Sequence, residues 1–268
     1  MTIAESPSTI SQLALFLSRK GRPVWPLTIE SKRALTPRMT RVIFGCPALG
    51  DLAWKRGQDL VLELPLADGD IARRHYTIRD IEGATLAIDF VRHGGALPGE
   101  VEAGSPSGSA TNHRSPAGRW LDAARPGDRL NAVGPRGHTY IHDADWHLFI
   151  GDETAIPAIF AMLEGLPPAA KAQAFIEIAD DAERQPAPRD AAIAWLPRGG
   201  AAPGPSRILY DAVEAFALPP GPGHAYVLGE TSSVRAIRQR LIARGLGKAQ
   251  TCAEGYWRPG RVGGHDHA

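Results

Sequence analysis

The chain is poor in cysteine and has no long hydrophobic run. Cys46 and Cys252 are the only cysteines among its 268 residues, and they lie far apart. Two such thiols form neither a disulfide framework nor a zinc or redox CxxC motif, so we expect a reduced, cytoplasmic protein. No apolar stretch approaches the roughly 20 residues of a membrane-spanning helix. The short run LALFL near the start lacks a preceding basic leader, so we expect neither a signal peptide nor an anchor.

The chain also lacks an excess of charge of either sign. Its 30 lysines and arginines face 29 aspartates and glutamates, a formal net charge of +1. This balance predicts no general attraction to nucleic acid or to a membrane, so an electrostatic function must be local. It also favours a monomer. None of the 9 histidines stands at metal-ligand spacing from another histidine, a cysteine or a carboxylate cluster, so we expect no metal centre.

Two kinds of sequence pattern divide the chain. From residue 23 to 142, short β-type runs alternate with glycine, proline and aspartate, which predicts an antiparallel β-barrel. After Trp146, fully apolar runs alternate with helical spacings, which predicts an open α/β sheet with parallel strands over 143–268. The remaining segments are an N-terminal extension (1–22) and a Gly/Ser/Pro-rich insertion (95–115). The runs that predict barrel strands are RVIF, DLVLELPL, HYTI, TLAIDFV and RLNAVGP.

Residues 73–80 read RRHYTIRD, the densest group of cations in the predicted barrel. Alternation along a strand places Arg74 and Tyr76 on one face. Arginine pairs with phosphate through two hydrogen bonds, tyrosine can stack on a flat heteroaromatic ring, and Thr77 can bond the edge of that ring. The motif alone equally fits a core tyrosine flanked by surface arginines.

The stretch GDET (151–154) stands between a predicted strand and a predicted helix. Ligands of open α/β sheets bind at the carboxyl ends of the strands, beside helix N-termini. There is no GxGxxG sequence, so the usual dinucleotide fingerprint is absent. Capping of the helix by Asp152, Glu153 and Thr154 explains the stretch as well as contact with a nucleotide does, and the two roles are compatible.

Five motifs occur in one order along the chain: LTPRMTRVIF, RHYTIRD, DFVRHG, GDETAIPAI and YWRPG. In this order and spacing the sequence resembles the siderophore-interacting protein family, FAD-containing ferric-siderophore reductases of the ferredoxin-reductase superfamily. The resemblance covers roughly residues 23–261. It implies a FAD-binding β-barrel followed by an α/β domain that binds NAD(P)H. It also implies reduction of ferric siderophores to release Fe(II), with the flavin carrying the chemistry and no catalytic side chain.

The resemblance also implies binding roles for individual residues. Arg74 would contact the FAD phosphates, Tyr76 the isoalloxazine ring and Thr77 its N5 edge. Arg258 is the strongest substrate candidate because it follows Tyr256 and Trp257 in the YWR motif. The implied FAD contacts are Arg74, His75, Tyr76, Thr77, Val91, Arg92, His93, Gly94, Ala117, Gly118, Trp120 and Thr154. The implied NAD(P)H contacts are Gly151, Asp152, Glu153, Thr154, Ala155, Arg198, Glu230 and Arg235. The implied contacts to an anionic ferric chelate are Lys55, Arg136 and Arg258.

This sequence departs from the family pattern beside the expected pyrophosphate site. The insertion separates His93 and Gly94 from Pro116, and Ser115 and Gly118 stand where the family usually has glycine and serine. A flexible loop of this length closes at modest entropic cost.

Several alternatives remain open at this stage. Ferredoxin can replace NAD(P)H as the electron donor, and arginines near GETSSVRAIRQR only slightly favour NADPH over NADH. A flavin reductase with another acceptor has the same architecture. A non-catalytic siderophore-binding or flavin-binding module would show no oxidation of NAD(P)H.

Overall fold

The structure is a computed structural model that describes residues 21–67, 69–92, 115–189 and 191–260. The chain forms two compact units. One comprises residues 1–54, 59–76 and 80–136, and the other comprises residues 55–58, 77–79 and 137–268. His93 and Gly94, two of the expected FAD contacts, lie outside the described residues.

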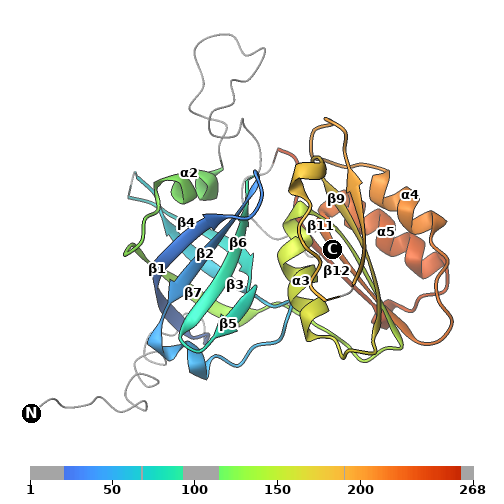
Figure 1. Ribbon diagram of the computed structural model, residues 1–268, viewed down its shortest axis with the longest axis horizontal. Coiled ribbons are helices and arrows are strands. Elements are labelled where there is room, and N and C mark those ends of the chain that lie inside the picture. The colour runs from blue at the N-terminus through green and yellow to red at the C-terminus, as the bar shows by residue number, and fades with distance from the viewer. Residues whose placement is uncertain (1–20, 68, 93–114, 190, 261–268) are drawn as a thin grey trace, which may run out of the picture. The chain divides into compact units, whose positions relative to one another are not determined.

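The first unit is built on a seven-stranded sheet that curls round on itself (Figure 1). Its strand order is β4-β3-β7-β1-β2-β6-β5, and the strand pairs β1–β2, β1–β7, β2–β6, β3–β7 and β5–β6 are antiparallel. The strands are β1 (Val24–Ala34), β2 (Met39–Gly45), β3 (Asp59–Pro65), β4 (Ile71–Thr77), β5 (Asp80–Glu82), β6 (Thr85–Val91) and β7 (Arg129–Arg136). A short 3-10 helix, η1 (Pro47–Asp51), and helix α2 (Pro116–Ala123) complete the unit.

The five runs that predicted barrel strands fall in strands of this sheet, except that Leu66 and Ile78 each lie one residue beyond a strand end. Their alternation buries one face: along β6, Leu86, Ile88 and Phe90 are almost completely buried. The pattern did not predict β1, in which Pro26 interrupts the apolar residues, although β1 pairs with both β2 and β7. It also did not predict α2, whose sequence PAGRWLDA contains a glycine and only eight residues.

The second unit is built on five parallel strands in the order β10-β9-β8-β11-β12. Figure 1 shows α3 apart from α4 and α5, which lie together. The core joins residues of β8 and β11 to α4 and α5. The strands are β8 (Trp146–Asp152), β9 (Lys171–Ile178), β10 (Ala192–Pro197), β11 (Gly223–Glu230) and β12 (Thr251–Trp257). The helices are α3 (Ile156–Gly165), α4 (Ile208–Ala215) and α5 (Thr231–Ala243), with 3-10 turns η2 (Glu153–Ala155), η3 (Asp181–Glu183) and η4 (Lys248–Gln250).

The predicted fold class is confirmed: an antiparallel sheet is followed by an open parallel α/β sheet. The apolar runs of β8 and β11 are buried at every position, as expected for strands covered on both faces. Among the described residues, no helix is both long enough and apolar enough to span a bilayer.

Candidate functional site

Strand β4 has two chemically different faces. Arg73 forms an ion pair with Glu63 at 3.1 Å, and the Nδ1 of His75 lies 2.7 Å from a carboxylate oxygen of Asp59. Arg136 donates to the Nε2 of His75 over 3.3 Å. Because guanidinium is only a donor, Nε2 accepts from Arg136 and Nδ1–H donates to Asp59. On this face, carboxylates therefore balance the positive charges.

The other face of β4 carries Arg74 and Tyr76, as the alternation predicted. The guanidinium of Arg74 donates to the carbonyl oxygen of Arg73 at 2.8 Å. Among the described residues, no carboxylate forms an ion pair with Arg74. Arg79, the third arginine of the motif, makes a bidentate pair with Glu164 on α3 at 2.5 and 2.6 Å. Of the motif's three arginines, Arg74 is thus the one whose charge remains available for an added anion.

Tyr76 belongs to a row of three aromatic rings. Its centroid lies 4.2 Å from that of Phe90 on β6, and Phe90 lies 5.4 Å from Trp120 on α2. Burial raises the pKa of the Tyr76 phenol well above its usual value, so the hydroxyl stays protonated and can donate a hydrogen bond. Trp120 is only 7% exposed, and its place at the far end of the row makes it a support for Phe90.

Helix α2 is fixed at both ends. The Ser115 hydroxyl accepts a hydrogen bond from the Gly118 N–H at 3.1 Å, so the serine is an N-cap. At the other end, the ammonium group of Lys32 donates to the carbonyl oxygens of Leu121 and Ala124 at 2.8 and 2.9 Å. The exchanged serine and glycine thus have a local explanation: the serine now supplies the cap, and a Cβ on Gly118 would come within 3.3 Å of the capping oxygen.

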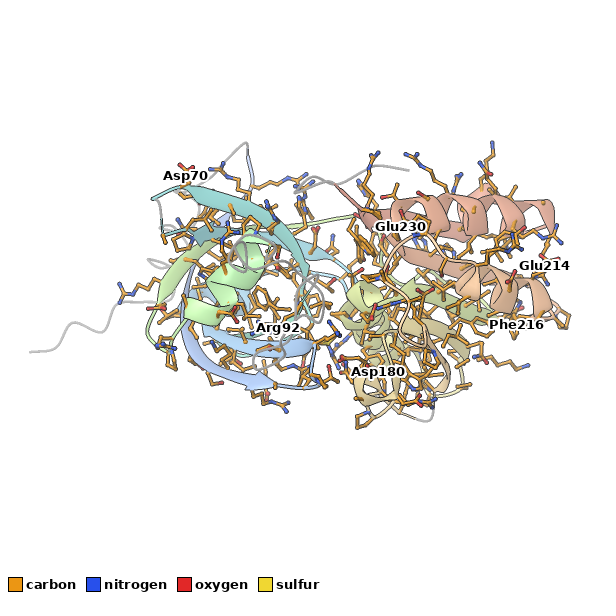
Figure 2. All side chains as sticks on the ribbon, turned by 90° about the horizontal axis from the view of Figure 1, so that it is seen from above. Asp70, Arg92, Asp180, Glu214, Phe216 and Glu230 are labelled. Atoms are coloured by element: carbon orange, nitrogen blue, oxygen red, sulfur yellow. The ribbon has the colours of Figure 1, made fainter. Side chains whose placement is uncertain are left out.

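Four of the remaining expected FAD residues lie at the ends of β4 and β6 or in α2. Val91 ends β6, and Ala117 is buried in α2. Arg92, labelled in Figure 2, bonds Asp122 of α2 at 2.5 Å through its side chain, so it connects the end of β6 to that helix. Thr77 is the last residue of β4 and is half-buried.

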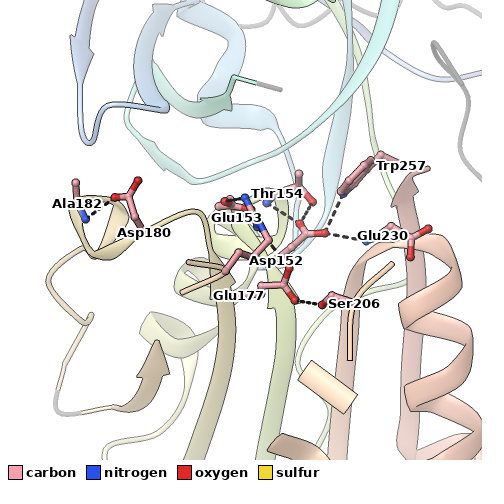
Figure 3. Close-up of polar contacts among 10 residues, drawn as sticks. Asp152, Glu153, Thr154, Glu177, Asp180, Ala182, Ser206, Glu230 and Trp257 are labelled. Atoms are coloured by element: carbon pink, nitrogen blue, oxygen red, sulfur yellow. Dashed lines mark hydrogen bonds and ion pairs between the residues drawn. The ribbon is translucent and has the colours of Figure 1, made fainter. Parts of the chain in front are cut away.

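Asp152 joins three strand ends at the carboxyl edge of the parallel sheet (Figure 3). One carboxylate oxygen accepts from the N–H and the hydroxyl of Thr154, at 2.9 and 2.5 Å. The other accepts from the Glu230 N–H at the end of β11 and from the Trp257 indole at the end of β12, both at 2.8 Å. Burial raises the pKa of Asp152, and the hydrogen bonds from Thr154 and Trp257 oppose the rise.

Tight packing around Asp152 requires glycine at two positions. Gly229 has a φ of +124°, and a Cβ there would come within 2.5 Å of the Asp152 carboxylate. A Cβ on Gly151 would meet Ala155 at 2.4 Å and the Leu228 carbonyl oxygen at 2.7 Å. Gly151 and Ala155 therefore act here as close-packing positions.

Glu153 and Arg198 form a buried ion pair beside this carboxylate. Two hydrogen bonds of 2.6 and 2.8 Å join them, and Glu177 lies 3.5 Å from the same guanidinium. Burial raises the pKa of Glu177, which also accepts a hydrogen bond from Ser206. Arg198, expected to contact the nucleotide, is 9% exposed and has Glu153 as its partner.

Glu230 occupies the N-terminus of α5. Its carboxylate accepts from the backbone N–H groups of Ser232 and Ser233 at 2.9 and 2.8 Å. Figure 2 labels Glu230 at this helix end. A phosphate would ordinarily use such amides, but here an internal carboxylate already binds them. Arg235 lies farther along α5 with its side chain exposed.

A small cavity of about 10 Å³, room for roughly one water molecule, lies among these groups at the carboxyl edge of the sheet. Its lining includes Asp152, Glu177, Arg198, Glu230, Ser233 and Trp257. Carboxylates outnumber cations in this lining. The cavity is too small for a nicotinamide ring, and the negative charge of its lining disfavours a phosphate at its mouth.

The three expected substrate cations have different surroundings. The exposed Lys55 places its ammonium 4.0 Å above the ring of Tyr140. Arg136 is engaged with His75, as described above. Arg258 follows the end of β12 and is half-buried.

One cluster of side chains had no signal in the sequence spacing. His142, His224 and Cys252 bring their ligand atoms within 4.8 Å of one another. His224 and Cys252 lie on the adjacent parallel strands β11 and β12, and His142 precedes β8. Burial and the neighbouring imidazoles lower the pKa of His224 to about 4. Only pairing of strands that are distant in sequence could have revealed this cluster.

The class of protein follows from the fold and from the matched families. The fold is ferredoxin-reductase-like, and it is shared with the solved ferredoxin reductase in carbazole 1,9a-dioxygenase at 15% identity and a TM-score of 0.63. Residues 58–139 match the siderophore-interacting FAD-binding domain, and residues 144–260 match the siderophore-interacting protein family. The chain belongs to the siderophore-interacting protein family.

Particular relatives support this assignment. A siderophore utilization protein from T. fusca has a solved structure that is 32% identical, with a TM-score of 0.76; the match covers 92% of this chain and 98% of that one. The ferric vibriobactin reductase ViuB of Vibrio cholerae is 32% identical over 217 residues, 75% of this chain and 73% of the relative. The NADPH-dependent ferric-chelate reductase of Escherichia coli is 31% identical over 101 residues, 36% of this chain and 32% of the relative.

Proposed function

We propose that this protein uses FAD and NAD(P)H to reduce ferric siderophores and release Fe(II). The observation that carries the proposal concerns Arg74 on β4. Among the described residues it has no carboxylate partner, and it lies on the same face as Tyr76. The other two arginines of the motif are bound to glutamates. An arginine kept apart from carboxylates beside an aromatic ring fits a phosphate attached to a flat ring system. The ferric vibriobactin reductase and the ferric-chelate reductase among the relatives support the reaction class.

Three residues of β4 fit FAD, each in a different respect. Arg74 supplies a permanent positive charge for a phosphate. Tyr76 supplies a ring that Phe90 supports from one side, and its protonated hydroxyl can donate. Thr77, at the end of the same strand, offers a hydroxyl and a backbone N–H to the edge of the ring. We assign these three residues to the phosphate, ring and ring edge of FAD.

The chemistry that FAD supplies when bound is the transfer of two electrons from a reduced nicotinamide, one at a time, to ferric iron. The protein's side chains therefore need not act as a general base or a nucleophile; their task is binding and orientation. One nicotinamide reduces two ferric ions. Oxygen-rich siderophores hold Fe(II) less tightly than the harder Fe(III), so reduction releases the metal.

The carboxyl edge of the parallel sheet beside Asp152 is our candidate site for the nicotinamide end of the donor, because ligands of open α/β sheets bind at that edge. The carboxylates there already bind internal donors, but their negative charge can stabilise the positive charge of the oxidised ring. The same carboxylates disfavour phosphate there, so we assign the phosphates to exposed cations such as Arg235. For the anionic chelate we assign Lys55 and Arg258. Arg136 has a structural role through His75.

The direct test is an anaerobic assay of the purified, FAD-loaded protein. We expect the visible flavin spectrum to bleach on addition of NADPH or NADH and to recover on addition of a ferric hydroxamate. Ferrozine should then trap two Fe(II) per nicotinamide oxidised. Bleaching by dithionite but by neither nicotinamide would point to another donor, such as ferredoxin. Failure of the protein to bind FAD would contradict the proposal, because every later step requires the flavin.

Tyr76 provides a sharper version of this test. Tyr76→Ala removes the ring and should weaken FAD binding roughly 10-fold, since an aromatic stack contributes on the order of 1–2 kcal/mol. Tyr76→Phe keeps the ring and should bind FAD nearly as well as the wild type. Equal binding by all three proteins would remove Tyr76 from the site.

A further inference from the structure

Two imidazoles converge on one thiol at the amino end of the parallel sheet. The Nε2 of His224 lies 3.4 Å from the Cys252 sulfur, and the Nε2 of His142 lies 3.6 Å from the same sulfur. A thiol has one proton and can donate it to only one of these nitrogens. The sulfur can also accept weakly from an imidazole N–H, so both imidazoles can hydrogen-bond it in the metal-free protein.

The separations match those of ligands on a tetrahedral metal ion. Zinc binds thiolate at about 2.3 Å and imidazole at about 2.0–2.1 Å, which puts sulfur and nitrogen about 3.6 Å apart at the tetrahedral angle. Both observed separations lie at this value or slightly below it. The three ligand atoms lie within 4.8 Å of one another, and rotation of the half-exposed His142 ring can shorten the remaining separation.

The surrounding structure holds the ligands in place through other contacts. Tyr226 pairs with Cys252 across β11 and β12, and its hydroxyl accepts from the His142 backbone N–H at 2.9 Å. The rings of His142 and His224 stack with centroids 4.4 Å apart and planes within 4° of parallel. His224 is buried, whereas His142 and Cys252 are half-buried. A cation from solvent can therefore reach the sulfur. The His142 ring must then turn out of its stack with His224, because the lone pairs of two parallel rings cannot both face one ion.

We propose that His142, His224 and Cys252 form a binding site for Zn²⁺. The donor set selects this class of metal because thiolate and imidazole favour zinc over the hard cations magnesium and calcium. Binding replaces the thiol proton: the Cys252 S–H bond breaks, a sulfur–metal bond forms, and one proton leaves to solvent. Both imidazoles bind in their neutral form. Three protein ligands leave a fourth position for water.

This site is separate from the one assigned to the electron donor. His224 and Cys252 lie near the starts of β11 and β12, whereas Asp152, Glu230 and Trp257 lie at the carboxyl ends of their strands. The metal would connect the segment before β8 to both strands. It would therefore stabilise the second unit without taking part in electron transfer, and FAD binding should not depend on it.

The test uses the full-length, FAD-containing protein after treatment with a chelator. Titration with Co²⁺ should produce a near-ultraviolet thiolate-to-cobalt band that saturates at one ion per chain, and Zn²⁺ should displace it. Cys252→Ser and His142→Ala should each abolish the band. Cys46→Ala is the matched control because Cys46 is the other thiol, and it should keep the band. Substitution of His265 and His267 controls for binding by the C-terminal histidines and should also keep it.

The outcomes separate this proposal from the reductase proposal. A band that persists in Cys252→Ser, or its absence in the wild-type protein, would overturn the zinc site. FAD content and circular dichroism of each variant show whether it has folded. Should Cys252→Ser fail to fold, His142→Ala carries the test, because His142 lies outside the strands. Loss of the band with unchanged FAD content supports the metal site whatever the reductase assay gives.

Discussion

Strand β4 and the carboxyl end of β8 use charged residues in opposite ways. On β4, Arg73 and His75 have carboxylate partners on one face, while Arg74 on the other face has none among the described residues. At the end of β8, Asp152 accepts four hydrogen bonds and Glu153 holds a buried arginine. Both stretches were predicted to bind a cofactor from their residue types. In the structure, the charge of Arg74 is available to a ligand, whereas the charges of Asp152 and Glu153 already stabilise the fold.

This difference explains why residue type alone is a weak guide to binding. A charged group is available to a ligand when the fold supplies no internal partner for it. Buried charges with full sets of partners contribute mainly to structure, and removing one partner leaves the other uncompensated. The predictions below test this distinction, from the largest expected loss to the smallest.

Removal of Asp152 should cause the largest loss of stability. Asp152→Ala leaves the buried Glu230 N–H and the Trp257 indole without their acceptor, so we expect the free energy of unfolding to fall by about 3–5 kcal/mol. Chemical denaturation monitored by circular dichroism measures this change. Asp180 is a matched control: it is exposed and caps η3 through one hydrogen bond to Ala182 at 2.8 Å. Asp180→Ala should cost about 1 kcal/mol or less, and equal losses would refute the role given to Asp152.

Disruption of the buried ion pair should rank second. Arg198→Met retains much of the side-chain volume but leaves Glu153 and Glu177 without their cation, which should cost about 3 kcal/mol. The comparison variant is Arg240→Met, which breaks the surface pair with Glu214 (Figure 2). We expect no measurable change there, because exposed pairs are screened by solvent. A similar loss in both variants would show that burial does not distinguish the two pairs.

Loss of the α2 cap should have the smallest effect on stability. Ser115→Ala removes the acceptor for the Gly118 N–H and should cost about 1 kcal/mol. Ser115→Asn keeps a capping oxygen and should restore most of that loss. Thermal unfolding of the three proteins side by side measures the difference, and a fully stable alanine variant would contradict the proposed reason for the serine–glycine exchange.

Much of the fold follows from local pattern, and some of the site does not. Alternation correctly placed Arg74 and Tyr76 on one face of a strand, because strand geometry is set by neighbouring residues. The sequence also predicted capping by Asp152 as one of two roles. It did not predict the hydrogen bonds that Glu230 and Trp257 donate to Asp152, because these depend on how β8, β11 and β12 align.

Other features escaped prediction for the same reason. The pairing of Arg198 with Glu153 spans 45 positions, and the contact of His142 with Cys252 spans 110. Such partners are joined by sheet order rather than by spacing in the sequence. Helix α2 was missed because its eight residues are stabilised by Ser115 and by the distant Lys32. Local propensity predicts helices and strands. The partner of a side chain, by contrast, depends on how the strands assemble into the sheet.

The central claim is that Arg74 provides the charge available to FAD, and equilibrium titration of apoprotein with FAD tests it most directly. Arg74→Ala should weaken binding roughly 30-fold, as expected from loss of a charge-assisted contact of about 2 kcal/mol. Arg73→Ala, one residue away on the opposite face, should bind FAD like the wild type. Equal affinities for both variants, or a larger loss in Arg73→Ala, would contradict the account.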